Sequence, residues 1–128
     1  MKPMTMYRRV VVEADLDDVD RGRRATAAVL HALRDRLTPD EGRQAVAQLP
    51  RELKTMWAPL AAPKRPLKIH RDAFYERVRS EAALRSLREA RAVTTAVFSA
   101  LKEQLSPGEA DDVHAQLPKD LKRVWEDA

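Results

Sequence analysis

Four basic side chains near the middle of the chain form a concentrated and uncompensated positive charge. Lys64, Arg65, Lys68 and Arg71 fall within eight residues, with no acidic residue between them. Pro63, just before this stretch, and Pro66 within it favour an extended backbone, and an extended basic segment can follow a phosphate backbone, with a counterion released at each contact. No aromatic residue lies between these charges to stack on bases. The segment is therefore a candidate phosphate or nucleic-acid contact, although a solvated connector is the favoured interpretation.

A second group of side chains, Asp15, Asp17, Asp18 and Asp20, has the spacing of a cation-binding loop. Calcium loops of this kind need a glycine at their sharp turn, and Asp20 stands at that position here. The same carboxylates also precede a predicted helix, where they would cap its N-terminus and interact favourably with its dipole. We expect capping here, with cation binding as the less favoured alternative.

The remaining polar residues do not form a catalytic or metal-binding pattern. His31, His70 and His114 lack the partner four residues away that a helical zinc site requires, and the chain contains no cysteine. No serine lies in a nucleophile-elbow sequence, and the three glycines are too scattered to surround a phosphate. The sequence therefore predicts no catalytic residue, no metal site, no cofactor and no enzyme.

The elements that position these side chains are encoded twice. Residues 7–57 align without a gap with residues 75–125, and 22 of the 51 positions are identical. Ala-Gln-Leu-Pro, for example, begins at Ala47 and again at Ala115. We predict one domain over 1–128 with three parts, namely repeat one at 1–57, a Pro-rich basic linker at 58–70 and repeat two at 71–128.

Hydrophobic periodicity predicts four helices in each repeat. In repeat one we expect helices at about 5–14 and about 19–37, a third helix that ends at Pro50, and a short fourth helix that carries Trp57. Repeat two should contain their copies. The second helix of each repeat is rich in alanine, which allows close approach, so these two helices are expected near the centre.

The third helix of each repeat begins with a capping-box pattern, Thr-Pro-x-Glu at Thr38 and Ser-Pro-x-Glu at Ser106. In a capping box the hydroxyl caps the helix, and the glutamate three residues later returns to the backbone N–H of the capping residue. This role would explain Glu41 and Glu109 without catalysis.

Two further recurring residues have predicted structural roles. Gln48 and Gln116, just before Leu-Pro, are expected to bond the exposed ends of neighbouring helices. Trp57 and Trp125 each follow a leucine by four residues, which predicts that both indoles belong to the core.

The composition is that of a globular chain towards the charged end of the range, with 44% hydrophobic and 34% charged residues. A repeat of this size would bury too little surface alone, so the repeats are expected to share one core. No apolar run approaches the ~20 residues of a membrane span, and the N-terminus does not resemble a signal peptide. We expect a cytoplasmic protein with no membrane partner.

The recurring residues together resemble the bacterial domain of unknown function 2267 over nearly the whole chain. The resemblance rests on Arg9-Val10 and its copy Arg77-Val78, an Ala-rich helix, Ser/Thr-Pro-x-Glu, and Ala-Gln-Leu-Pro-x-x-Leu-Lys in both repeats. It implies an all-helical, duplicated fold and no established activity. Members often have glycine in the loop after the first helix, where this chain has Asp15 and Ala83.

These observations predict an all-α bundle of about eight helices, built from two repeats with approximate two-fold symmetry. The favoured function is a non-catalytic interaction module or stress-related accessory protein that binds a protein partner, or itself, through an exposed helical face. The alternative is weak, non-specific nucleic-acid binding through the four basic residues of the linker region. A metal-dependent enzyme is supported by the acidic cluster at 15–20 alone.

Overall fold

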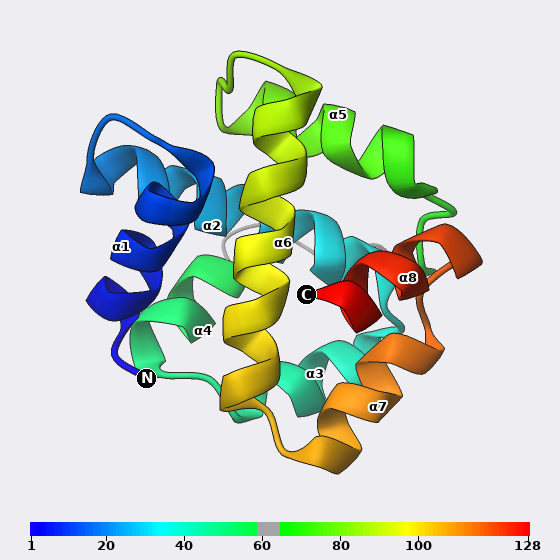
Figure 1. The fold of residues 1–128 in the computed structure, drawn as a ribbon. Helices are drawn as coiled ribbons and strands as arrows, with labels where there is room; N and C mark the ends of the chain where they lie inside the picture. Colours follow the sequence, from blue (N-terminus) through cyan, green and yellow to red (C-terminus); the bar gives the residue numbers. More distant parts are fainter. Residues whose placement is uncertain (59–64) are drawn as a thin grey trace.

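The computed structural model describes residues 1–58 and 65–128, and all regular structure in these residues is helical. The all-α prediction is confirmed, and each helix of repeat two has a counterpart in repeat one. The two-fold relation between the repeats stays a prediction. The eight helices are α1 (Pro3–Ala14), α2 (Val19–Arg36), α3 (Pro39–Ala47), α4 (Arg51–Trp57), α5 (Arg71–Glu81), α6 (Leu87–Gln104), α7 (Pro107–Ala115) and α8 (Lys119–Asp127) (Figure 1).

The two long, alanine-rich helices α2 and α6 lie at the centre and contact each other, as predicted. Three alanines on each of these helices are fully buried, namely Ala25, Ala28 and Ala32 on α2 and Ala90, Ala96 and Ala100 on α6. Alanine has no side chain beyond Cβ, so the two backbones can approach closely while both helices keep strong helix formers.

The first helix of each repeat packs against the second helix of both repeats. α1 contacts α2 and α6, and α5 contacts α6 and α2. Ion pairs also join the first helix of one repeat to the second helix of the other. Arg9 Nη1 bonds Glu103 Oε2 at 2.8 Å, and Arg77 Nη2 bonds Asp35 Oδ2 at 2.5 Å. The buried apolar side chains of both repeats consequently form one core, as predicted.

Asp35 is the centre of a buried ionic cluster near the end of α2. Arg34 Nε donates to Asp35 Oδ1 at 2.8 Å, and Arg34 Nη1 donates to the carbonyl of Trp57 at 2.7 Å. Burial by itself would raise the pKa of Asp35, but the hydrogen bonds from Arg34 and Arg77 outweigh it and hold that pKa below its usual value. In repeat two, Lys102 Nζ donates to the carbonyl of Trp125 at 2.8 Å, so α8 is held in a corresponding way.

Both tryptophans belong to the core, as predicted. Trp57 is 6% exposed and Trp125 is 3% exposed. Trp125 also contacts Phe98 edge to face, with ring centroids 5.1 Å apart, and Phe98 contacts Phe74 at 5.8 Å. Such pairs add about 0.5–1.5 kcal/mol each beyond the burial of their area.

The loops after α1 and α5 contain a residue in the left-handed region. Asp15 has a φ of 53° and Ala83 a φ of 52°. These are the two positions at which members of the resembled family often carry glycine. Aspartate tolerates this conformation better than alanine does, because alanine has no side-chain oxygen to bond the local backbone.

The capping residues of α3 and α7 are confirmed, but one half of the predicted capping box is wrong. Thr38 Oγ1 accepts the N–H of Glu41 at 3.3 Å, and Ser106 Oγ accepts the N–H of Glu109 at 3.2 Å. The glutamate side chains do not return to the backbone of the capping residues. They lie between α3 and α7 instead.

The glutamates do not bond the backbone N–H groups of the capping residues Thr38 and Ser106. Gln116 and Gln48 bond them instead, each from the other repeat. The N–H of Thr38 donates to Gln116 Oε1 at 2.8 Å, and the N–H of Ser106 donates to Gln48 Oε1 at 2.7 Å. The predicted role of both glutamines at helix ends is confirmed, and it also explains why no glutamate is needed there.

Candidate functional site

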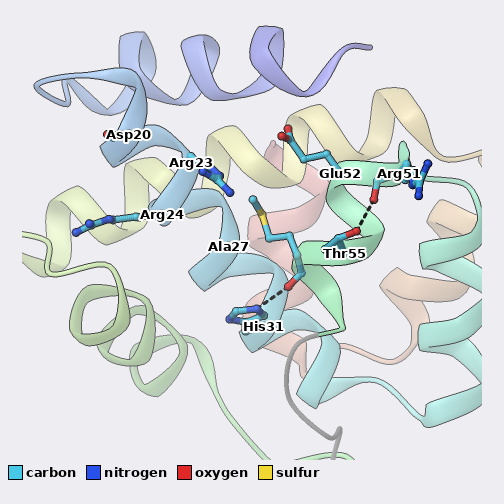
Figure 2. Close-up of a pocket in the computed structure, with 9 residues that line it drawn as sticks. Asp20, Arg23, Arg24, Ala27, His31, Arg51, Glu52 and Thr55 are labelled. Carbon is cyan, nitrogen blue, oxygen red and sulfur yellow. Dashed lines mark hydrogen bonds between the residues drawn. The ribbon is translucent and has the colours of Figure 1, made fainter.

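An open groove of about 940 Å³ lies between α2 and α4, and we call it the arginine groove (Figure 2). Both helices present alternating cationic and small or apolar side chains to it. Its lining residues are Asp20, Arg23, Arg24, Ala27, His31, Arg51, Glu52, Thr55 and Met56.

Helical spacing places these side chains on facing surfaces. Arg23, Ala27 and His31 follow one another at intervals of four residues, so they share one face of α2. Arg51 and Thr55 have the same spacing on α4, where the Thr55 hydroxyl donates to the Arg51 carbonyl at 3.1 Å. In Figure 2 Arg23 extends from α2 towards α4, while Arg24 and Arg51 lie at the two edges.

His31 lies at one end of the groove. Its Nε2 lies 2.7 Å from the carbonyl oxygen of Met56, and its Nδ1 lies 2.9 Å from Glu81 Oε2. Both partners are acceptors, an arrangement that favours the doubly protonated imidazole with its two N–H donors. The hydrogen bond to Glu81 raises the pKa of His31 despite the opposing effect of burial. The ring thereby connects α2 to α4 and α5.

Tyr7, from α1, fixes Glu52 at the other end. The Tyr7 hydroxyl donates to Glu52 Oε2 at 2.8 Å. Burial raises the pKa of Tyr7, and the hydrogen bond and negative charge of Glu52 raise it further, so the hydroxyl remains a donor. One carboxylate oxygen of Glu52 is thus already engaged by α1.

The three arginines of the groove have no hydrogen-bond or ion-pair partner for their side chains among the residues that the structure describes. Arg23, Arg24 and Arg51 are all exposed, and they outnumber the lining carboxylates, Asp20 and Glu52. Each guanidinium offers five N–H donors in a fixed planar arrangement that matches a carboxylate or a phosphate. The groove can therefore bind an anionic group.

A smaller groove of about 360 Å³ occupies the corresponding position in repeat two. It also contains three arginines, but two of them are paired with neighbouring acids in the same groove. Arg71 Nε lies 3.3 Å from Asp72 Oδ1, and Arg123 Nε lies 3.4 Å from Asp127 Oδ2. Three aspartates balance the three arginines there, so of these two grooves it is the groove of repeat one that has more arginines than carboxylates.

The structure describes three of the four basic residues that the sequence grouped as candidate phosphate contacts. Lys64 lies outside the described residues. Arg65 and Lys68 are exposed, without a side-chain partner in the described part of the chain. Arg71 begins α5 and is surrounded by acids, because its N–H also donates to Asp120 Oδ2 at 3.0 Å.

The acidic cluster at 15–20 acts mainly at a helix end, as expected. Asp18 is the N-cap of α2, and its Oδ1 accepts the N–H of Arg21 at 2.9 Å. Asp17 bonds Arg85 at 2.7 Å, and this hydrogen bond holds the pKa of Asp17 below its usual value. Capping is confirmed for Asp18.

The arginine groove was not predicted, although the repeats contain a signal for it. Tyr7 and Arg23 recur in repeat two as Tyr75 and Arg91, and Glu52 recurs as an aspartate. Arg23 and Arg91 are exposed, and a charged residue that recurs at an exposed helical position indicates a shared surface feature. Tyr7 and Tyr75 are themselves buried. In the structure Arg23 lines the groove.

The fold and the groove define an all-helical protein whose described residues form corresponding helix pairs around one core. The chain belongs to the DUF2267 family, because the sequence model of that family, described as "Uncharacterized conserved protein (DUF2267)", matches residues 4–124. The match extends from α1 into α8 and confirms the resemblance noted in the sequence. No curated protein matches the chain.

A separate finding concerns the helices as a set. In the described part of the chain, every helix is too short or too polar to cross a lipid bilayer.

Proposed function

We propose that this protein is a non-catalytic interaction module whose arginine groove binds an acidic, amphipathic segment of a partner protein. The observation that carries the proposal is the set of three exposed guanidiniums that lack side-chain partners among the described residues. Carboxylates of a partner would bond them bidentately, which supplies orientation as well as energy.

The floor of the groove determines what kind of anion fits. Ala27 and Met56 lie between the charged side chains, and both are half-buried. The methionine side chain is flexible and adapts to apolar partners of different shape. An occupant that presents apolar side chains to the floor and carboxylates to the edges would use the whole surface, whereas a phosphate backbone would meet Asp20 and Glu52 without an apolar contact.

The second groove supports this interpretation by contrast. Arg123 of repeat two corresponds to Thr55 of repeat one, and its partner Asp127 has no equivalent in the described residues of repeat one. The same fold can therefore hold arginines that are paired with acids. The helices of repeat one do not need unpaired arginines in order to fold. Binding of an anionic partner would explain them.

The test is a fluorescence-anisotropy titration of the full chain with a labelled helical peptide that has leucine on one face and glutamate on the other. We expect the double variant Arg23→Ser/Arg51→Ser to weaken binding about 2- to 30-fold, since each exposed charge pair contributes about 0.2–1 kcal/mol. The matched control is Arg91→Ser/Arg123→Ser in the second groove, which should leave the affinity unchanged. Added salt should weaken binding of the parent.

Two results would contradict the proposal. Equal affinity of the parent and the Arg23→Ser/Arg51→Ser variant would remove the groove as the binding surface. Binding of a labelled DNA duplex that is stronger than binding of the peptide, and that is lost in Arg65→Ser/Lys68→Ser, would instead support the nucleic-acid alternative.

A further inference from the structure

The contact between α3 and α7 brings two buried glutamates together. The helices lie side by side (Figure 1) and contact each other. Glu41 on α3 and Glu109 on α7 occupy corresponding positions and are 6% and 7% exposed. One carboxylate oxygen from each, together with one from Asp112, lies within 4.8 Å of the other two. Asp112 is exposed, so the cluster opens to solvent on the α7 side.

The two glutamates are buried without the partners that such groups need. Oε1 of Glu41 and Oε1 of Glu109 each lack a hydrogen-bond partner in the described part of the chain. Neither glutamate forms an ion pair with any described lysine, arginine or histidine. Burial of an unpaired carboxylate is costly, and native structures rarely leave such oxygens unsatisfied.

The charges around the two glutamates increase their need for a compensating partner. Burial, a hydrogen bond to Glu109 and the negative charges of Glu109 and Asp112 raise the pKa of Glu41 to about 8. Every charged group that acts on Glu41 in this way is another carboxylate. The N-terminal ends of α3 and α7 favour negative charge, but their capping N–H groups are already bonded by Thr38 and Ser106. A proton or a cation must therefore compensate the cluster.

We propose that Glu41, Glu109 and Asp112 form a binding site for a hard divalent cation, with Ca²⁺ as the ion that fits best. Carboxylate oxygens are the ligands that such cations prefer. An ion that contacts all three oxygens at about 2.3–2.6 Å, as Ca²⁺ does, spans ligand separations up to about 5 Å. Mg²⁺ demands near-ideal octahedral geometry at about 2.0–2.1 Å and gives up its water reluctantly, so it suits a site made of two helix-fixed glutamates and one aspartate less well. Water would complete the coordination through the open side at Asp112.

Cation binding at this site is coupled to proton release. A ligand carboxylate must be ionised, so a bound cation displaces any proton that the cluster holds, and acid should weaken binding. Glu109 and Asp112 are the charged groups that face Glu41 in this equilibrium.

The experiment measures the melting temperature of the full chain with CaCl₂ or MgCl₂, together with calorimetric titration in two buffers of different ionisation enthalpy. At about a hundredfold excess over Kd, we expect Ca²⁺ to raise Tm by roughly 5–10 °C and Mg²⁺ to raise it less. Chelation of the ion should reverse the shift. The two buffers should give different heats, because a proton is released.

Three variants assign the effect to the cluster. Glu109→Gln and the exposed Asp112→Asn should abolish or strongly reduce the Ca²⁺ shift, and Asp112→Asn should fold even if the buried change does not. Asp111→Asn is the matched control, because it removes the same charge from the neighbouring position on α7. It should keep the full shift.

A Tm that does not change with about 10 mM Ca²⁺ between about pH 6 and 9 would overturn the proposal, and the glutamates would then be a pair that shares a proton. An undiminished shift in Asp112→Asn, or one in Glu109→Gln equal to that of the parent, would also overturn it. The arginine groove shares no lining residue with this cluster, so neither result affects the proposed function.

Discussion

Replacement of Gln116 with alanine tests whether the bonds that cross between repeats hold α3 and α7 together. Gln116 Oε1 accepts the N–H of Thr38 at 2.8 Å, and Gln116 Nε2 donates to Thr38 Oγ1 at 3.2 Å. Each hydrogen bond contributes about 0.5–1.5 kcal/mol net. Loss of both should lower the free energy of unfolding by about 1–3 kcal/mol. The upper part of this range applies if no water replaces Gln116 as the acceptor for the N–H of Thr38.

Urea unfolding followed by tryptophan fluorescence provides the measurement, because both tryptophans are buried and should report global unfolding. Gln44→Ala is the matched control, since Gln44 is an exposed glutamine on α3 that forms no side-chain hydrogen bond among the described residues. Gln48→Ala should have a smaller effect than Gln116→Ala, because Gln48 and its partner Ser106 are both exposed.

The double variant Gln48→Ala/Gln116→Ala should lose about the sum of the single effects, because the two glutamine–hydroxyl pairs share no atom. If Gln116→Ala unfolds at the same urea concentration as Gln44→Ala, the crossing bonds do not stabilise the fold and the reasoning fails.

Four further outcomes are expected. Ala83→Gly should stabilise the protein by about 0.5–1 kcal/mol in urea, because glycine removes the left-handed strain at φ 52°; a loss of stability would contradict this. Asp35→Asn should be less stable at neutral pH, and the difference from the parent should shrink as the pH falls below about 4, since the lowered pKa of Asp35 gives stability that is lost on protonation. Trp57→Ala should cost about 3–5 kcal/mol of unfolding free energy, whereas water-like tryptophan emission from the folded parent would rule out burial. Residues 1–57 alone should give no cooperative thermal transition by circular dichroism, because α1 and α2 would lose their partners α6 and α5.

The features that the sequence predicted well depend on residues close together in the chain. The helix ends follow from periodicity, proline and capping hydroxyls, all of which act within one or two turns. The N-caps Thr38, Ser106 and Asp18 are local in this sense. The core tryptophans were also predictable, since each shares a helical face with a leucine four residues earlier.

The features that it missed depend on how distant segments meet. The capping-box rule assigns Glu41 to the N–H of Thr38, but Gln116, which is 78 positions away in the chain, takes that N–H instead. The displaced glutamate then meets its counterpart in repeat two. The arginine groove likewise requires α4 to fold back on α2, and no local pattern in either helix specifies that contact.

The first helix of each repeat packs against the second helix of the other repeat, so α1 must wait for a partner that is synthesised much later. Arg9 on α1 bonds Glu103 on α6, a separation of 94 positions. At about 5–20 residues per second, roughly 5–20 s pass between synthesis of α1 and synthesis of its partner. During this interval the face of α1 that will contact α6 has no native cover. In a nascent chain α1 is therefore a segment on which a ribosome-associated chaperone, or a second nascent copy offering its own α6, would act.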